Sequence, residues 1–347
     1  MPFLMIGTQR SGSNLLRLMI NQLPGIVAPH PPHIMERMGP LLPEYGPLTV
    51  RAFSQLIEDV CWLIEANPVP WEGLVLDRGQ IHDRCQERSL AAVFHACYDL
   101  LAEAVSADDW CCKSLANVHY LKEIESSFCD EARYIHLYRD GRDVALSFRK
   151  AIVGDKHWYH LARQWHLEQQ LALQLRNQIP AERFFSVQYE ELTAHPEKIL
   201  RGLCDFMGQE YRPEMMNYHE SSEADRTATA GAMWANVGQP VKSDNSRKYL
   251  TQATPEELSI FESVAGASLS ELGYERHFIQ PGEEHQYSTE TIQQFDEENR
   301  QLQAKVMEET SEADLRKREP QVVIMRIIRH RLALSAPTGA SRNAAGV

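Results

Sequence analysis

The sequence FLMIGTQRSGSNLLRLMI, residues 3–20, decides the fold prediction. Residues 3–6 form a short apolar run that ends at Gly7, which is typical of a buried strand. From residue 13 to residue 23 apolar side chains recur at helical spacing, and the Pro-Gly pair at 24–25 then ends the helix. We therefore predict a strand, a loop and a helix in this order.

The loop itself, GTQRSGSN at residues 7–14, has the composition of an anion-binding turn. A glycine-containing loop between a strand and a helix directs backbone N–H groups and the positive helix end toward a bound phosphate. The loop resembles the pattern G-x-x-x-x-G-K-[ST], but Ser13 stands where nucleotide triphosphatases have lysine. Taken alone, the same pattern is also typical of a tight turn that packs a helix on a sheet without binding a ligand.

A second strand-to-helix unit begins at residue 133 and contains RDGRDVALS at residues 139–147. Asp140 and Asp143 are spaced as a helix cap and its partner. Arg139 falls at the carboxyl end of the predicted strand, where α/β proteins bind ligands, and Ser147 falls on the helix that follows. An arginine and a hydroxyl in these places can hold one phosphate from two sides. The alternative is a capped surface helix with ordinary charges.

The remaining pattern alternates strands with helices, which predicts a parallel sheet. Apolar periodicity predicts helices over about residues 52–66, 89–105, 158–177 and 196–208 and a strand over 184–189. Residues 221–246 show no sustained period, which predicts a long loop or lid. We divide the chain into a domain of residues 1–280 and a mainly helical extension of residues 281–347. In this extension we expect a charged helix over about 288–318, packing of residues 322–334 on the same domain or on a partner chain, and disorder in the last dozen residues.

With both motifs present in this order, the chain resembles the sulfotransferase family, whose signatures are R/K-S-G-[ST] after the first strand and a later R-D-x-R-D-V-x-x-S. Residues 189–192, YEEL, look like the family's Y-E-D-L segment, and the resemblance covers about residues 3–275. It implies an α/β fold with a P-loop-like central parallel sheet flanked by helices. It also implies transfer of a sulfonate group from 3′-phosphoadenosine 5′-phosphosulfate to a hydroxyl or amine, with 3′-phosphoadenosine 5′-phosphate as product and no metal.

The resemblance further implies roles for the residues at matching positions. The residues that fall on the loop around the 5′-phosphosulfate are Arg10, Ser11, Gly12, Ser13 and Asn14. Those that fall at the 3′-phosphate, the adenine or the ribose are Arg139, Ser147, Tyr189, Arg247 and Lys248. Arg10 and Lys113 match the cations that stabilise the leaving phosphate. The sequence departs from the family at Tyr249, where a glycine is usual, and at Leu15, where many animal members have a tryptophan that stacks on adenine.

The general base has to be sought away from Lys113. Several family members carry the base beside this lysine, where the present sequence has Cys112 and Leu115. We therefore predict His30, or alternatively His33, in the Pro-rich segment APHPPH of residues 28–33, because a histidine has a near-neutral pKa. The alternative is that both histidines are polar residues of a turn. The sequence also offers a weaker cluster for the acceptor pocket, consisting of Asp77, Arg78 and His82.

Composition limits the partners of the chain. A net charge of −13 argues against a nucleic-acid binder, because phosphate contacts need a surplus of basic residues. Seven cysteines without a paired C-x-x-C spacing are typical of free thiols in a reducing compartment. No apolar run is long enough to span a bilayer, and residues 1–10 do not form a signal peptide. We expect a cytoplasmic, non-transmembrane enzyme whose acceptor is a small molecule, lipid or carbohydrate, with the extension as a candidate contact between subunits.

Two other functions remain open at this point. A nucleotide-dependent small-molecule kinase would use the same general fold, although the absence of a lysine at Ser13 disfavours it. An inactive nucleotide-binding scaffold would not need the cations Arg10 and Lys113 together with a histidine base. The sequence does not identify the acceptor.

Overall fold

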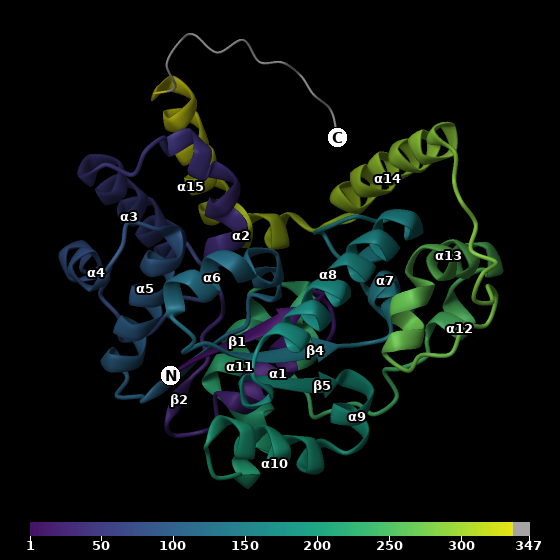
Figure 1. Ribbon diagram of the computed structural model, residues 1–347, viewed down its shortest axis with the longest axis horizontal. Coiled ribbons are helices and arrows are strands. Elements are labelled where there is room, and N and C mark those ends of the chain that lie inside the picture. Colours follow the sequence, from purple (N-terminus) through teal and green to yellow (C-terminus); the bar gives the residue numbers. More distant parts are fainter. Residues whose placement is uncertain (336–347) are drawn as a thin grey trace.

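The computed structural model describes residues 1–335. Five strands form one parallel sheet in the order β2-β3-β1-β4-β5. The strands are β1 (Pro2–Gly7), β2 (Ile26–Val27), β3 (Asp109–Cys112), β4 (Arg133–Tyr138) and β5 (Phe184–Gln188). Helices surround this sheet (Figure 1), so the predicted α/β architecture with a central parallel sheet is confirmed. The expected disorder of the last dozen residues, 336–347, lies outside the described residues.

The other elements are helices, with η denoting a 3-10 helix. They are α1 (Ser13–Ile20), α2 (Ile34–Met38), η1 (Gly39–Tyr45), α3 (Val50–Glu65), α4 (Arg78–Arg84), α5 (Leu90–Ala104), η2 (Leu115–Tyr120), α6 (Leu121–Phe128), α7 (Gly141–Arg149), α8 (Trp158–Gln178), η3 (Ala181–Arg183), α9 (Tyr189–Ala194), α10 (Pro196–Met207), η4 (Pro213–Glu220), α11 (Ser222–Thr229), η5 (Ala232–Gly238), α12 (Tyr249–Gln252), α13 (Pro255–Glu271), α14 (Thr289–Glu309) and α15 (Glu312–Ser335). The helices predicted over 52–66, 89–105, 158–177 and 196–208 correspond to α3, α5, α8 and α10.

Each face of the sheet has its own hydrophobic core. Side chains alternate along a strand, so neighbouring residues of β1 point to opposite faces. Phe3 and Met5 pack in a cluster with α1, α10 and η4, whereas Leu4 and Ile6 pack in a cluster with α3, α5 and α6. Because both faces are covered, β1 can be apolar throughout, as the sequence showed.

The stretch predicted as a loop, residues 221–246, contains α11 and η5. Ser221 caps α11 by accepting a hydrogen bond from the Ala224 amide at 3.2 Å, and Ala224 and Thr227 are buried. With only eight residues, α11 is too short to show a sustained period, and its stability comes from packing rather than from sequence propensity.

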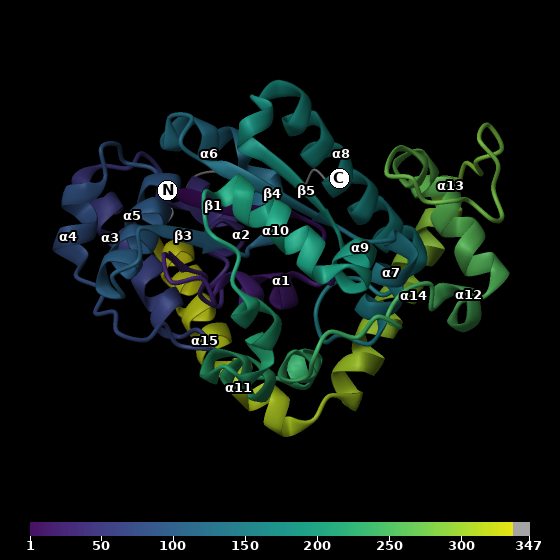
Figure 2. The same ribbon diagram turned by 90° about the horizontal axis from the view of Figure 1, so that it is seen from below.

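The extension folds back over the domain as two helices (Figure 2). A single helix was predicted over 288–318, but α14 ends at Glu309 and Ser311 caps the next helix, accepting from the Asp314 amide at 3.2 Å. On α14, Asn299 Oδ1 accepts from the amides of Lys156 and His157 at 2.7 and 3.0 Å. On α15, a buried apolar stripe packs on α3 and η1; it consists of Met325, Ile328 and Leu332. The extension is therefore attached to the domain at both ends.

Within residues 1–335, no helix combines the length and the apolar content that crossing a lipid bilayer requires. The same residues bring together no group of three or more His, Cys, Asp or Glu side chains placed to hold a metal ion.

A buried ionic network attaches α7 to α13. Arg142 lies 2.8 Å from the Asp140 carboxylate and 2.7 Å from the Glu262 carboxylate. Glu262 also accepts from the backbone amides of residues 277–279 at 2.8 to 3.1 Å. Since all the charged groups have partners, the network fixes the position of the α7 start, where the RDGRDV motif lies.

We expect Arg142→Ala to destabilise the fold by about 3–5 kcal/mol, because the substitution leaves two carboxylates buried without their cation. Denaturant unfolding followed by circular dichroism measures the change. Arg300→Ala, which removes an exposed pair with Glu297, is the matched control and should change stability by less than about 0.5 kcal/mol. Equal effects of the two substitutions would contradict a structural role for the network.

Candidate active site

A cavity of about 1760 Å³ lies at the carboxyl ends of three neighbouring strands. Arg10 lies in the loop after β1, Lys113 directly follows β3 and Arg139 directly follows β4, and all three side chains line the cavity. Parallel sheets place their ligands at this edge, because the loops after all strands gather there. The sequence motifs therefore converge on one cavity.

The loop after β1 depends on two glycines. A Cβ at Gly7 would lie 2.3 Å from the Leu137 carbonyl oxygen, so only glycine allows β1 to approach β4 there. Gly12 has a φ of 92°, and a Cβ on it would lie 2.4 Å from the Tyr189 ring. Gly12 precedes α1 and provides no side-chain cap, which leaves the first amides of α1 available to a ligand.

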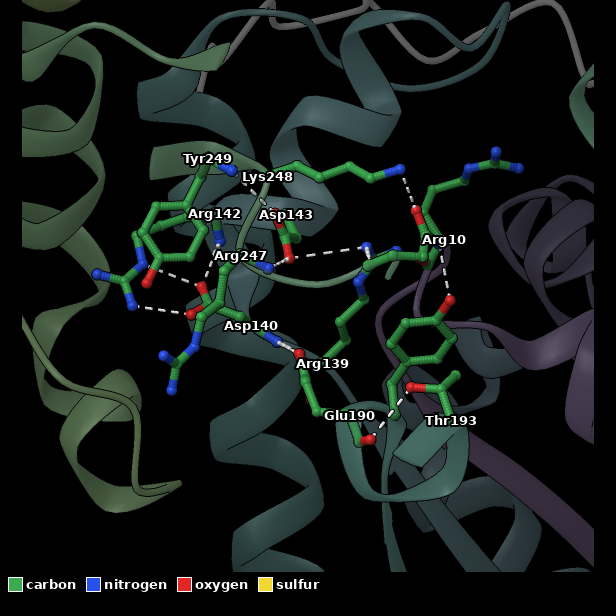
Figure 3. Close-up of polar contacts among 12 residues, drawn as sticks. Arg10, Arg139, Asp140, Arg142, Asp143, Glu190, Thr193, Arg247, Lys248 and Tyr249 are labelled. Carbon is green, nitrogen blue, oxygen red and sulfur yellow. Dashed lines mark hydrogen bonds and ion pairs between the residues drawn. The ribbon is translucent and has the colours of Figure 1, made fainter. Parts of the chain in front are cut away.

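The second motif is joined to the first through Ser147 and Arg139. Arg10 Nε donates to Ser147 Oγ at 3.0 Å, and Arg139 donates to the Arg10 carbonyl oxygen at 3.4 Å. Arg139 also donates to the Asn245 carbonyl oxygen at 2.6 Å, and its guanidinium lies 4.4 Å from the centre of the Tyr189 ring. Figure 3 shows Arg10 and Arg139 on the same side of the α7 start.

The YEEL segment, residues 189–192, contacts both the loop after β1 and the start of α7. Tyr189 packs on Gly12 and on Arg139, and its hydroxyl accepts a hydrogen bond from Asn245 at 2.7 Å. Glu190 accepts from the Asp140 amide at 3.0 Å and so satisfies a backbone donor at the start of α7. Through these contacts the YEEL segment holds the loop after β1 and the start of α7 in position.

The side chains of the basic pair Arg247 and Lys248 lie in different surroundings. Asp143 accepts from the backbone amides of Arg247 and Tyr249 at 2.7 and 3.1 Å. The Arg247 side chain is exposed and does not line the cavity, whereas Lys248 does and donates to Asn245 Oδ1 at 2.7 Å. Of the predicted pair, only Lys248 presents its side chain to the cavity.

Burial and repulsion from neighbouring cations lower the pKa of two side chains in the cavity, Lys113 and Arg10. Burial, Arg17 and Arg10 together lower the pKa of Lys113 to about 7. Burial, Arg139 and Arg318 lower the pKa of Arg10 to about 10. An anion bound between these groups would oppose both shifts.

His30 is buried, with 3% of its surface exposed, and lines the cavity. Asn67 donates from Nδ2 to the His30 carbonyl oxygen at 2.8 Å, which directs Asn67 Oδ1 to His30 Nδ1 at 3.2 Å. This arrangement assigns the ring proton to Nδ1, and Nε2 has no hydrogen-bond partner among the described residues. Burial, followed by the charges of Lys113 and Arg17, holds the pKa of His30 well below its usual value.

His33 lies beside the carboxylate of Glu36, a residue outside the sequence motifs. Its Nδ1 is 3.0 Å from both Glu36 Oε2 and Ser114 Oγ. Burial lowers the pKa of His33, and Glu36 partly opposes this effect. Although burial alone would raise it, the contact with His33 and the charge of Arg37 lower the pKa of Glu36 to about 2. The i, i+3 spacing of His33 and Glu36 at the start of α2 is the sequence signal for this pair.

The extension supplies one wall of the cavity through α15. The Asp314 carboxylate accepts from the Ala232 amide at 3.1 Å, and the Arg318 guanidinium lies 5.2 Å from the centre of the Trp234 ring. Trp234 in turn packs edge-on against His30, with ring centres 4.8 Å apart. These contacts connect residues far apart in sequence, which motif reasoning cannot anticipate.

The weaker acceptor cluster of Asp77, Arg78 and His82 lies on or next to α4 and does not line the cavity. Asp77 caps α4, and Arg78 pairs with Glu58 and Glu65. The physical reason for its position is that these carboxylates draw Arg78 toward α3.

Comparisons with known proteins agree with this geometry. A family model described as the sulfotransferase family matches residues 2–213, more than half of the 347-residue chain. The fold is similar to that of the sulfotransferase domain of the Synechococcus PCC 7002 olefin synthase, with 20% identity, a TM-score of 0.50 and coverage of 76% of this chain and 93% of that one. It is also similar to that of the sulfotransferase domain from the curacin biosynthetic pathway, with 20% identity, a TM-score of 0.55 and coverage of 79% and 98%.

A search of curated proteins gave no significant match. The family match spans β1, β3, β4 and β5 and therefore all the strands that position the cavity residues. From these observations it follows that the chain belongs to the sulfotransferase family.

Proposed function

We propose that this sulfotransferase uses 3′-phosphoadenosine 5′-phosphosulfate as donor and a hydroxyl compound as acceptor, in the cavity between β1, β3 and β4. The observation that carries the proposal is the pairing of two anion-binding elements, the loop of residues 7–14 and the Arg139–Ser147 unit, across one cavity. A donor with a phosphosulfate at one end and a phosphate at the other has two anions to place. Each element supports one of them.

The residues of the cavity fit such a donor. Ser11 Oγ, Asn14 Oδ1 and Arg139 Nε are buried and have no hydrogen-bond partner among the described residues. Buried polar atoms are normally paired, so these atoms are available to a ligand. We assign the 5′-phosphosulfate to residues 10–14 and Lys113, and the 3′-phosphate to Arg139, Ser147 and Lys248. Arg247 contributes only its backbone.

The adenine needs an apolar contact other than the tryptophan that Leu15 replaces. Leu15, Val237 and Val241 line the cavity beside α1 and η5. We assign the adenine to these side chains, since they form an apolar region of the wall next to the phosphate loop.

When bound, the donor supplies an activated sulfonate group. Transfer requires the acceptor oxygen to form a bond to sulfur while the bond from sulfur to the bridging phosphate oxygen breaks, and that oxygen keeps the electron pair. Arg10 and Lys113 stabilise the charge that develops there. The proton of the acceptor hydroxyl goes to a histidine.

We assign the base to His33 rather than to His30. Glu36 stabilises the imidazolium that forms when His33 accepts the proton at Nε2. His30 has the cations Lys113 and Arg17 near it, and these oppose its protonation. His30 Nε2 instead accepts a hydrogen bond from the acceptor or the donor while remaining neutral.

The donor assignment predicts a preference for the 3′-phosphate. Calorimetry should show that 3′-phosphoadenosine 5′-phosphate binds more tightly than AMP, and Arg139→Ala should weaken the former by about ten- to hundredfold, because it removes charge-assisted hydrogen bonds. The affinity for AMP should change little. Binding of ATP as tight as that of the 3′-phosphorylated nucleotide would favour the kinase alternative and reject this donor.

The depressed pKa of Lys113 predicts proton uptake on donor binding. Lys113 is largely neutral above pH 7 in the free enzyme, and a bound anion restores its charge. Since the phosphates are already ionised there, affinity for 3′-phosphoadenosine 5′-phosphate should fall by up to about tenfold per unit as pH rises from 7 to 9, with uptake of about one proton. Calorimetry in buffers of different ionisation enthalpy measures the uptake. Lys113→Met should abolish it; uptake that persists would refute the assignment.

The base assignment predicts unequal effects of two histidine substitutions. His33→Ala should lower kcat by about 10²–10⁴-fold with unchanged binding of 3′-phosphoadenosine 5′-phosphate. Glu36→Gln should lower kcat less, and it should lower the pH at which activity is lost toward acid, because without the carboxylate the His33 imidazolium is less stable and the pKa of His33 falls. Product release assays with an acceptor from a screen of hydroxyl compounds give both values. A larger loss in His30→Ala than in His33→Ala would transfer the base role to His30.

A further inference from the structure

We propose that a second, basic pocket beside the main cavity binds an anionic group of the acceptor, a carboxylate or a phosphate, and that this enzyme therefore sulfonates acidic acceptors. The pocket has a volume of about 620 Å³. We call it the arginine pocket, and its lining consists of Arg37, Val322, Met325, Arg326, Arg329 and His330. The inference rests on the proposed function, since it concerns the acceptor of that reaction.

The arginine pocket adjoins the reaction site. Arg37, Val322 and Arg329 line both the arginine pocket and the main cavity. Arg37 directly follows Glu36 on α2, and its charge acts on both His33 and Glu36. A molecule whose hydroxyl lies at His33 can therefore extend past Arg37 into the arginine pocket.

The arginine pocket gathers positive charge without a carboxylate in its lining. Among residues 1–335, no hydrogen bond or ion pair joins the side chain of Arg37, Arg326 or Arg329 to a partner. Arg326 and Arg329 are exposed to solvent, whereas Arg37 Nε is buried. Buried donors are normally paired, and in a chain of net charge −13 a cluster of unpaired cations is a local exception.

The donor cannot supply this anion. Its phosphosulfate and its 3′-phosphate are assigned to residues after β1, β3 and β4, and none of these residues lines the arginine pocket. The acidic side chains that α15 presents to the main cavity lie outside the arginine pocket, and two of them have partners: Asp314 binds the Ala232 amide and Glu312 pairs with Arg316. An anion bound in the arginine pocket would therefore come from a third group, and the acceptor is the remaining reactant.

The apolar part of the lining indicates the rest of the acceptor. Val322 and Met325 precede Arg326 and Arg329 on α15 and offer contact for a carbon skeleton. The acceptor class is accordingly a hydroxyl compound with an apolar body and a terminal carboxylate or phosphate.

Matched acceptor pairs test this inference. The probes are ω-hydroxycarboxylic acids of four to sixteen carbons, their methyl esters, and the corresponding hydroxyalkyl phosphates. For at least one chain length the acid or the phosphate should exceed the neutral ester by about tenfold or more in kcat/KM. This preference should disappear in Arg37→Gln and in Arg329→Gln, while the affinity for 3′-phosphoadenosine 5′-phosphate stays within about twofold of wild type.

Arg300→Gln is the control, because Arg300 is an exposed arginine of the extension that pairs with Glu297 and lines neither cavity. It should retain the full preference. Comparing carboxylate with phosphate probes shows which anion the pocket favours. Esters that react as well as acids, a preference that survives both substitutions, or failure of every anionic probe to react or to bind the nucleotide-saturated enzyme would overturn the inference. If wild-type enzyme failed to bind 3′-phosphoadenosine 5′-phosphate, the donor assignment would be at fault instead.

Discussion

The packing of Gly12 on the ring of Tyr189 is the contact on which the site depends. The ring occupies the space that a Cβ at Gly12 would need, and the Arg139 guanidinium lies over the same ring. Three segments that are far apart in sequence are thereby held at fixed positions relative to one another. Because a buried aromatic ring can move very little in a close-packed interior, packing fixes the distance between the loop of residues 7–14 and the Arg139–Ser147 unit.

Holding several cations close together in one cavity has an electrostatic cost, because the like charges repel one another. Arg10, Lys113 and Arg139 lie close together at one edge of the sheet, and two of them have a lowered pKa. In the absence of a ligand this arrangement destabilises the fold. The buried network around Arg142, in which every charge has a partner, fixes the start of α7 next to Arg139.

The sequence predicted the parts of the protein that depend on local chemistry. The strand, loop and helix at residues 2–20 and the capped helix after Arg139 follow from spacing, glycine and capping preferences, and all are present. The family and its chemistry followed from the same residues. By contrast, α11 was predicted as loop because an eight-residue helix carries little periodic signal and is stabilised by packing.

The cavity walls were less predictable, because they depend on tertiary contacts. Asn67 and Glu36 orient the two candidate histidines, yet neither belongs to a recognisable motif. The separation of Arg247 from Lys248 follows from a backbone contact to Asp143 that composition does not reveal. The role of α15 as a wall depends on how two helices return across the domain, and only the structure gives that path.

The strand order β2-β3-β1-β4-β5 has a consequence for how the chain is made. β1 pairs with β3 and β4, which begin at Asp109 and Arg133, so the first strand leaves the ribosome long before either neighbour exists. Until then an apolar strand and the loop after it have no sheet to join. During this interval the apolar residues of β1 have no partner strand, and association with other chains competes with folding.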